Sequence, residues 1–162
     1  MNTLVMSPVT PIQKISLGLR TFEALLMRLT PIADLAARLW VANVFFKSGL
    51  LKIQSWDSTL SLFMYEYHVP LLDPELAAWM GTFTELFFPV LLALGLGGRV
   101  VPGVLFVFNI IAVISYPDLD PVGVEQHQVW GVLLLISLSH GAGKLSLDYW
   151  IGKLLGHRRA HA

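Results

Sequence analysis

The amino-acid sequence predicts an all-α integral membrane four-helix bundle, with amphipathic interfacial helices at its N- and C-terminal ends. Three observations support this prediction: four long apolar stretches, Lys and Arg residues gathered on one side, and two amphipathic flanking segments. Of the 162 residues, 55% are apolar and 14% are charged, which is much less charge than a soluble domain carries. We therefore expect residues 1–162 to form one transmembrane domain with little besides its helices.

The four predicted spans cover residues 33–53, 74–96, 100–116 and 122–143. Each reaches or approaches the roughly 20 helical residues that are needed to cross a hydrocarbon core about 30 Å thick. The glycine-rich residues 95–98 form a tight connection between the second and third spans, which predicts an antiparallel pair.

Two amphipathic segments, residues 12–29 and 145–156, flank these spans and are expected to lie in the membrane interface. Thr30 and Pro31 suit an N-cap and a first helical position, so the first span is expected to start as a separate helix there. The polar lead, residues 1–11, lacks the apolar core of a cleavable signal peptide. The first span is then expected to act as its own insertion signal.

The basic residues give the predicted orientation. Nine of the eleven Lys and Arg residues fall on one side of the predicted spans: Lys14, Arg20, Arg28, Arg38, Arg99, Lys144, Lys153, Arg158 and Arg159. By the positive-inside rule, both termini face the cytoplasm. The predicted location is the bacterial cytoplasmic (inner) membrane, with several passes across it.

Charge and cysteine content exclude several kinds of function. Eleven basic and eleven acidic residues give zero formal net charge, so nothing points to a nucleic-acid partner. The chain contains no cysteine. Disulfide exchange by the chain itself, thiolate metal sites and covalent c-type haem attachment are therefore excluded.

Glu85 is the most informative polar residue, because it falls near the middle of the second span. An ionisable group at that depth costs roughly 2.5–3.5 kcal/mol and often has a function. Pro89 follows four residues later and cannot donate to the Glu85 carbonyl, which leaves that acceptor free. Glu85 is a candidate for handling a proton or a quinol, and the alternative is a carboxyl group that holds the helices together.

Three basic residues of the first span are further candidate functional residues. Arg38 and Lys52 share a helix face with Gly49, but each lies close enough to a membrane boundary to snorkel, and Asp34 is placed to neutralise Arg38. Lys47 lies deeper, so a Lys47–Glu85 ion pair is a second hypothesis.

Asn109 and His127 complete the set of candidate polar residues. Asn109 falls at a depth similar to that of Glu85 and is expected either to hydrogen-bond it or to serve packing alone. His127 belongs to an acidic outer rim that also contains Glu66, His68, Asp73, Asp118, Asp120 and Glu125. The rim lacks the spacing of metal ligands on a helix, so no metal residue is assigned.

The sequence resembles the DoxX family of small four-helix membrane proteins. The resemblance rests on the segments Arg38–Trp40 and Phe45–Lys52, followed by Glu85, Pro89, Leu92 and Gly95, and it covers about residues 33–143. The tail Gly141–Trp150 looks like that of a DoxX branch that accompanies small metal-stress peptides and their modifying enzymes. The resemblance implies a helical bundle in a redox or stress-response setting and supplies no catalytic residues.

Three hypotheses for function follow. The favoured one is an accessory or anchor subunit of a membrane redox or stress-response system, not catalytic alone, with a membrane or peripheral redox protein as its partner. The second is an electron- or proton-transferring component of a quinone-linked oxidoreductase, with quinone as cofactor held by Glu85 and Arg38 or Lys52. The third is a small transporter or metal-stress protein. Small residues on the spans (Gly49, Gly81, Gly103 and Gly131) permit close packing or a homo-oligomer in the lipid bilayer.

Overall fold

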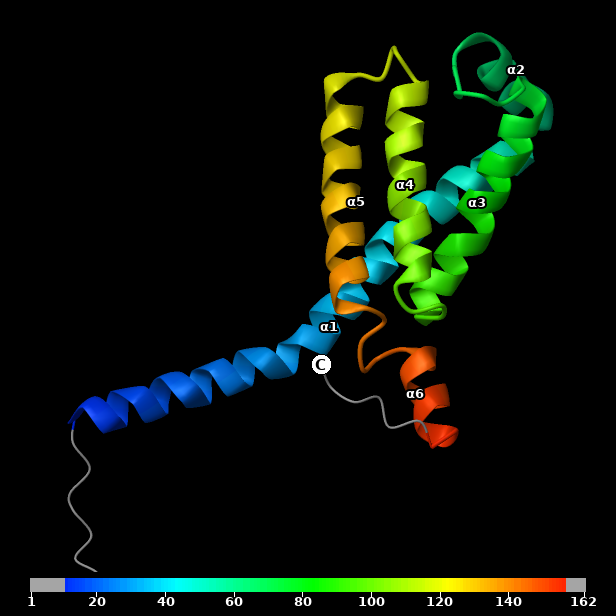
Figure 1. The fold of residues 1–162 in the computed structure, drawn as a ribbon. Helices are drawn as coiled ribbons and strands as arrows, with labels where there is room; N and C mark the ends of the chain where they lie inside the picture. Colours follow the sequence, from blue (N-terminus) through cyan, green and yellow to red (C-terminus); the bar gives the residue numbers. More distant parts are fainter. Residues whose placement is uncertain (1–10, 157–162) are drawn as a thin grey trace, which may run out of the picture.

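The computed structural model describes residues 11–156, apart from the side chains of residues 11–15 and 21. This part of the chain is all-helical and contains no strand (Figure 1). Its helices are α1 (Pro11–Gln54), α2 (Trp56–Tyr65), α3 (Pro74–Leu94), α4 (Val100–Ser115), α5 (Pro121–His140) and α6 (Leu147–Leu154). The polar lead, residues 1–11, lies outside the described residues except for Pro11, and so does most of the prediction about a signal peptide. Arg158 and Arg159 also lie outside the described residues.

Helix α1 is one continuous helix of 44 residues, so the predicted restart at Thr30 and Pro31 is wrong. A proline inside a helix removes one hydrogen bond and favours a bend, but the remaining hydrogen bonds can carry the helix past it. Figure 1 shows α1 changing direction in its blue section, and Pro31 lies inside this helix. The first flank and the first predicted span are therefore two parts of one helix.

Local sequence sets the ends of the shorter helices. Asp73 accepts a hydrogen bond from the Glu75 amide at 2.9 Å, and Pro74 follows it as the first residue of α3. Asp120 and Pro121 repeat this arrangement at the start of α5. Helix α3 ends at Gly95, whose φ of 68° is a left-handed conformation that glycine adopts easily.

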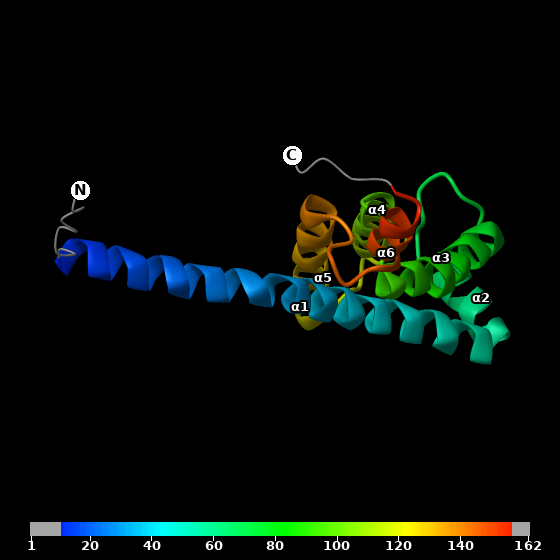
Figure 2. The same cartoon turned by 90° about the horizontal axis from the view of Figure 1, so that it is seen from below.

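The second half of α1 packs against α3 and α5, and α4 packs against both α3 and α5. Helix α2 lies against the first part of α3. The main buried cluster joins α1, α3, α4 and α5 through Val41, Ala42, Phe45, Leu92, Val101, Leu105 and Leu134. The first part of α1 runs away from the other helices, as both Figure 1 and Figure 2 show.

The packed helices have two ends, which we name by their residues. The Arg38 end contains the end of α3, the start of α4, the end of α5 and the segment leading into α6. The Lys52 end contains the end of α1, α2, the start of α3, the end of α4 and the start of α5. Figure 1 shows α3 diverging from α4 toward the Lys52 end.

Two described helices, α1 and α3, are long and apolar enough to cross a membrane, and α4 is apolar but shorter. Many large apolar side chains on the outer helix faces are exposed, among them Phe83 and Phe87 on α3, Ile114 on α4 and Val132 on α5. Such a surface suits contact with lipid. That all four predicted spans cross a membrane stays a prediction.

The four glycines that suggested close packing all face neighbours within the same chain. A Cβ atom at Gly49 would lie 2.9 Å from Leu86, and one at Gly81 would lie 3.3 Å from Phe63. The corresponding neighbours are Asn109 for Gly131 and Leu138 for Gly103. These glycines serve packing inside the chain, and a homo-oligomer stays a prediction without their support.

Candidate functional site

A cavity of about 420 Å³ lies at the Lys52 end, between α1, α3, α4 and α5. Its wall is mostly apolar and includes Phe45, Phe108 and Trp130. Tyr67, Val69 and Leu72, from the connection between α2 and α3, cover its outer part. Small-molecule sites typically have this character, an apolar wall carrying a few polar groups.

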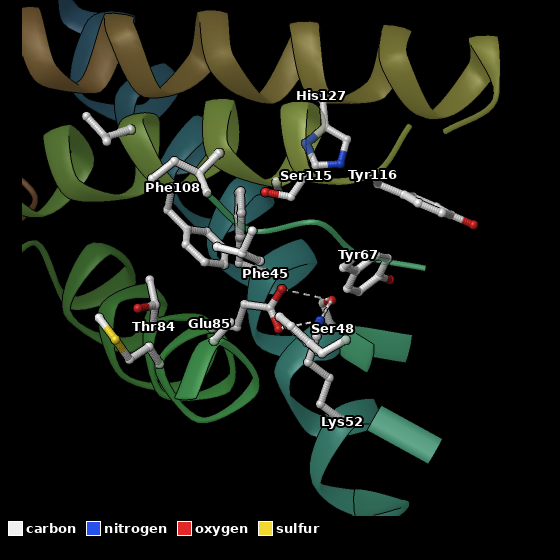
Figure 3. A pocket seen from close by; sticks show the side chains of 18 of the residues that line it. Phe45, Ser48, Lys52, Tyr67, Thr84, Glu85, Phe108, Ser115, Tyr116 and His127 are labelled. Atoms are coloured by element: carbon white, nitrogen blue, oxygen red, sulfur yellow. Dashed lines mark hydrogen bonds and ion pairs between the residues drawn. The ribbon is translucent and has the colours of Figure 1, made fainter. Parts of the chain in front are cut away.

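Glu85 lies on the α3 wall of this cavity and is 6% exposed. Lys52 Nζ lies 2.6 Å from Glu85 Oε2 and donates a second hydrogen bond to Ser48 Oγ at 3.0 Å. Ser48 Oγ in turn donates to Glu85 Oε1 at 3.2 Å. Figure 3 shows the three side chains meeting between α1 and α3. They form a closed polar cluster, which we call the Glu85 cluster (Ser48, Lys52 and Glu85).

The helix geometry explains why these residues meet. Ser48 and Lys52 are four residues apart, so they lie on one face of α1. Gly49 lies between them and lets α3 approach, because a Cβ atom there would be only 3.0 Å from Glu85 Cβ. Lys47 is exposed and points elsewhere, so the Lys47–Glu85 hypothesis is wrong and Lys52 is the partner.

Asn109 does not contact Glu85 and pairs with His127 instead. Asn109 Nδ2 donates to the His127 carbonyl at 3.0 Å, and Asn109 Oδ1 lies 2.8 Å from His127 Nδ1. The start of α5 lies beside α4, which brings the two residues together. His127 lines the cavity, and Figure 3 shows its ring on the wall opposite Glu85.

Arg38 lies at the other end of the molecule and does not line the cavity, so its predicted role beside Glu85 is wrong. Ten residues separate it from Ser48, which is about 15 Å along a helix. Arg38 is 2% exposed and donates to the carbonyls of Leu92 at 3.2 Å and Leu145 at 2.6 Å. The snorkelling expected of Arg38 and Lys52 is also wrong, because both find partners inside the protein.

Asp34 was expected to neutralise Arg38, but its carboxylate contacts His140 at 2.8 Å. Arg38 donates its hydrogen bonds to backbone carbonyl groups, which include those of Leu92 and Ala93 at the end of α3. Arg38 therefore ties the end of α3 to the segment before α6.

Sequence reasoning missed five polar residues of the cavity: Ser48, Tyr67, Thr84, Ser115 and Tyr116. The four-residue spacing from Ser48 to Lys52 was a usable signal. Tyr67 and Ser115 follow only from how the connections fold over the cavity. Burial, followed by the nearby Tyr116, Glu85 and Glu66, raises the pKa of Tyr67, so its hydroxyl stays protonated at neutral pH.

The acidic rim does not gather into a metal site within residues that the structure describes. Among them, no three His, Asp or Glu side chains lie close enough to hold an ion. His127, the rim residue nearest the cavity, is engaged by Asn109.

The family model DoxX matches residues 33–117. This chain belongs to the DoxX family. The matched part includes Arg38, the Glu85 cluster and Asn109, and ends before His127. No curated protein and no solved structure matched the chain. Family membership, together with the apolar helices, indicates a membrane protein.

Proposed function

We propose that this DoxX-family protein binds the ring of a lipophilic quinone in the cavity at its Lys52 end, as the membrane component of a redox system. The observation that carries the proposal is the Glu85 cluster, which lies on the wall of a mostly apolar cavity. The cavity volume of about 420 Å³ falls within the range of small-ligand sites.

The Glu85 cluster provides complementary chemistry for a quinone oxygen. Lys52 is a hydrogen-bond donor for a ring oxygen, and Glu85 is a proton acceptor when that oxygen carries a hydrogen. A buried ion pair contributes little to stability compared with apolar packing, because removing both charges from water is costly. Binding of a ligand in the cavity would account for the presence of the Lys52–Glu85 ion pair in its wall.

Electron transfer in this proposal requires a partner protein, because the chain has no cysteine with which to exchange electrons as a dithiol. The quinone is the exchangeable ligand and the partner is the other redox component. In this proposal the protein lies in the bacterial inner membrane, with α1, α3, α4 and α5 as four spans and both termini in the cytoplasm. The positive-inside distribution of Lys and Arg supports this orientation.

The test is native mass spectrometry with lipid and quinone extraction on protein purified gently from its own membrane. Wild type should carry close to one quinone per chain, and both Glu85→Gln and Lys52→Met should lose most of it. Glu75→Gln and Lys47→Met are matched controls, because both residues are exposed and lie on the same two helices. Wild-type protein without quinone would contradict the proposal, as would equal retention in all four variants.

A second candidate function is an anchor for a partner protein, and the exposed first part of α1 favours it. Phe22, Leu26 and Leu29 share one exposed face of this helix, which extends past the other helices in Figure 2. An apolar face of this kind needs lipid or protein to cover it. Nothing among the described residues favours the third hypothesis, a transporter or metal-stress protein.

Changing Phe22 and Leu26 to Asp separates the two candidate functions. Loss of a co-purifying protein with quinone content unchanged would identify the first part of α1 as an anchor. Retention of that protein in the double variant would reject the anchor function for this segment.

A further inference from the structure

The cavity wall opposite Glu85 carries two further polar side chains, His127 from α5 and Ser115 from the end of α4. Ser115 is 4% exposed, and its hydroxyl is buried without a hydrogen-bond partner. A buried hydroxyl without a partner costs free energy, and a native protein rarely leaves one without a reason. Figure 3 shows Ser115 and His127 close to each other on this wall.

The hydrogen bonds of Asn109 define which nitrogen of His127 carries a hydrogen. The His127 carbonyl can only accept, so the Asn109 group facing it at 3.0 Å must be the NH₂ group. The Asn109 oxygen therefore faces Nδ1 of the imidazole at 2.8 Å. Because this oxygen can only accept, Nδ1 must donate. In the neutral ring Nε2 then has a free lone pair and is an acceptor.

The two walls of the cavity consequently differ in what they offer. The Glu85 cluster offers a cationic donor, a carboxylate acceptor and a hydroxyl. The opposite wall offers the Nε2 acceptor of His127 and the unpartnered hydroxyl of Ser115. A ligand oxygen at this wall fills both groups only if it donates to His127 Nε2 and accepts from the Ser115 hydroxyl.

We propose that the cavity prefers the reduced form of its ligand, the quinol, and that His127 determines this preference. The inference rests on the proposed function and extends it to a specific redox form. A quinol hydroxyl can donate to His127 Nε2, while its second hydroxyl donates to Glu85 and accepts from Lys52. A quinone has only acceptor oxygens, so the one at this wall can accept from Ser115 but leaves the Nε2 lone pair without a hydrogen.

Asn109 is a positioning residue in this account, because it acts through His127. It fixes the ring orientation and the position of the hydrogen, as second partners of histidines commonly do. Ser115 adds a hydrogen bond to the same ligand oxygen.

The test compares the affinity of one alkyl-substituted benzoquinone with that of its chemically reduced quinol. Both are measured anaerobically by equilibrium dialysis against purified protein in lipid nanodiscs. Wild type should bind the quinol about tenfold more tightly than the quinone, as expected when one form leaves a site acceptor unpaired. His127→Phe should bring the ratio of the two affinities close to one. His140→Phe at the Arg38 end is the control and should leave the ratio unchanged.

Ser115→Ala is a second variant of the same cavity wall, and it can be measured if the His127 variant fails to fold. This hydroxyl has no partner to lose, so the protein should fold normally while its quinol affinity falls by about fivefold. Equal affinities of wild type for both forms, or a ratio that His127→Phe leaves unchanged, would overturn the inference. The proposed function would still stand after such a result if both forms bind and Lys52→Met abolishes their binding. If wild type binds neither form, the proposed function fails as well.

Discussion

The two ends of the packed helices both contain buried charged groups, but in different surroundings. At the Arg38 end, a buried guanidinium joins the end of α3 to the segment before α6, and Leu105 and Leu134 are fully buried nearby. At the Lys52 end, a buried ion pair and an unpartnered hydroxyl face a cavity of about 420 Å³. Both ends contain buried charge, but at the Lys52 end it faces a space large enough for a ligand.

The difference shows that a buried charge has to be interpreted through its surroundings. The hydrogen bonds of Arg38 go to backbone carbonyls, which need donors because they lie at helix ends or in a connection. Asp148 adds to this end by accepting from the Gly98 amide at 2.6 Å. The Glu85 cluster satisfies its own charges while leaving them accessible to a ligand. In the proposed function, the Lys52 end therefore binds the ligand and the Arg38 end stabilises the fold.

The largest effect should come from removing the Arg38 side chain. Arg38→Leu removes the guanidinium that donates to the carbonyls of Leu92 and Leu145. Each hydrogen bond from a charged group contributes roughly 1.5–3 kcal/mol, so we expect a loss of about 4 kcal/mol in unfolding free energy. Denaturation in mixed detergent micelles, followed by circular dichroism, measures it. Arg99→Gln is the control, since Arg99 is exposed and makes one hydrogen bond to the Ser139 carbonyl. Equal stability of the two variants would refute a structural role for the Arg38 end.

Breaking the ion pair at the Lys52 end should have the next largest effect. Lys52→Met leaves a buried carboxylate without its cation and should destabilise the protein by about 3 kcal/mol. Combining it with Glu85→Gln should restore most of that loss, because no unpaired charge remains, while quinone binding stays absent. The same unfolding assay, run as a double-mutant cycle, gives the coupling free energy. Additive losses in the double variant would contradict the pairing.

Two glycines allow a sharper comparison within the Lys52 end. A methyl group at Gly49 would push Leu86 and the Glu85 backbone region away from α1, so Gly49→Ala should cost about 2 kcal/mol and weaken ligand binding. Gly81→Ala meets only the end of the Phe63 ring at 3.3 Å and should be milder. Thermal unfolding of the two variants, with bound quinone measured in parallel, tests whether close contact of α1 and α3 holds the Glu85 cluster.

The smallest effect is expected for Thr82, whose hydroxyl is buried on α3 without a partner and does not line the cavity. Thr82→Val keeps the shape and removes a hydroxyl that makes no hydrogen bond. Stability should stay the same or rise by less than about 1 kcal/mol, with quinone content unchanged. Reduced quinone content in this variant would show that binding depends on more of α3 than the cavity wall.

Much of the fold could be predicted from the sequence because helix signals are local. Apolar length predicted the four long helical regions, and the predicted starts at residues 74 and 122 lie within one residue of the starts of α3 and α5. The break expected at Pro31 failed, because a proline lowers helix stability without always ending the helix. Local sequence rules could not decide whether the helix would end at Pro31 or continue past it.

The candidate site could be predicted only in part, since its residues come from separate helices. Glu85 and Lys52 were both named, but estimates of depth in the membrane pointed to Lys47 as the ion-pair partner of Glu85. The rotation of α1 against α3, set by the contact at Gly49, selects Lys52. Pairing of Asn109 with His127 depends in the same way on how α5 lies against α4. Such rotations result from packing of the whole chain.

Photoaffinity labelling in native membranes tests the central claim most directly. An azido-substituted quinone should label residues around the cavity, such as Tyr67, Phe108 and Trp130, and unlabelled quinone should suppress that labelling. Peptide mass spectrometry identifies the labelled positions, and Lys52→Met should lose them. Labelling spread over exposed apolar positions such as Phe83 and Val132, without suppression by unlabelled quinone, would contradict a binding site at the Lys52 end.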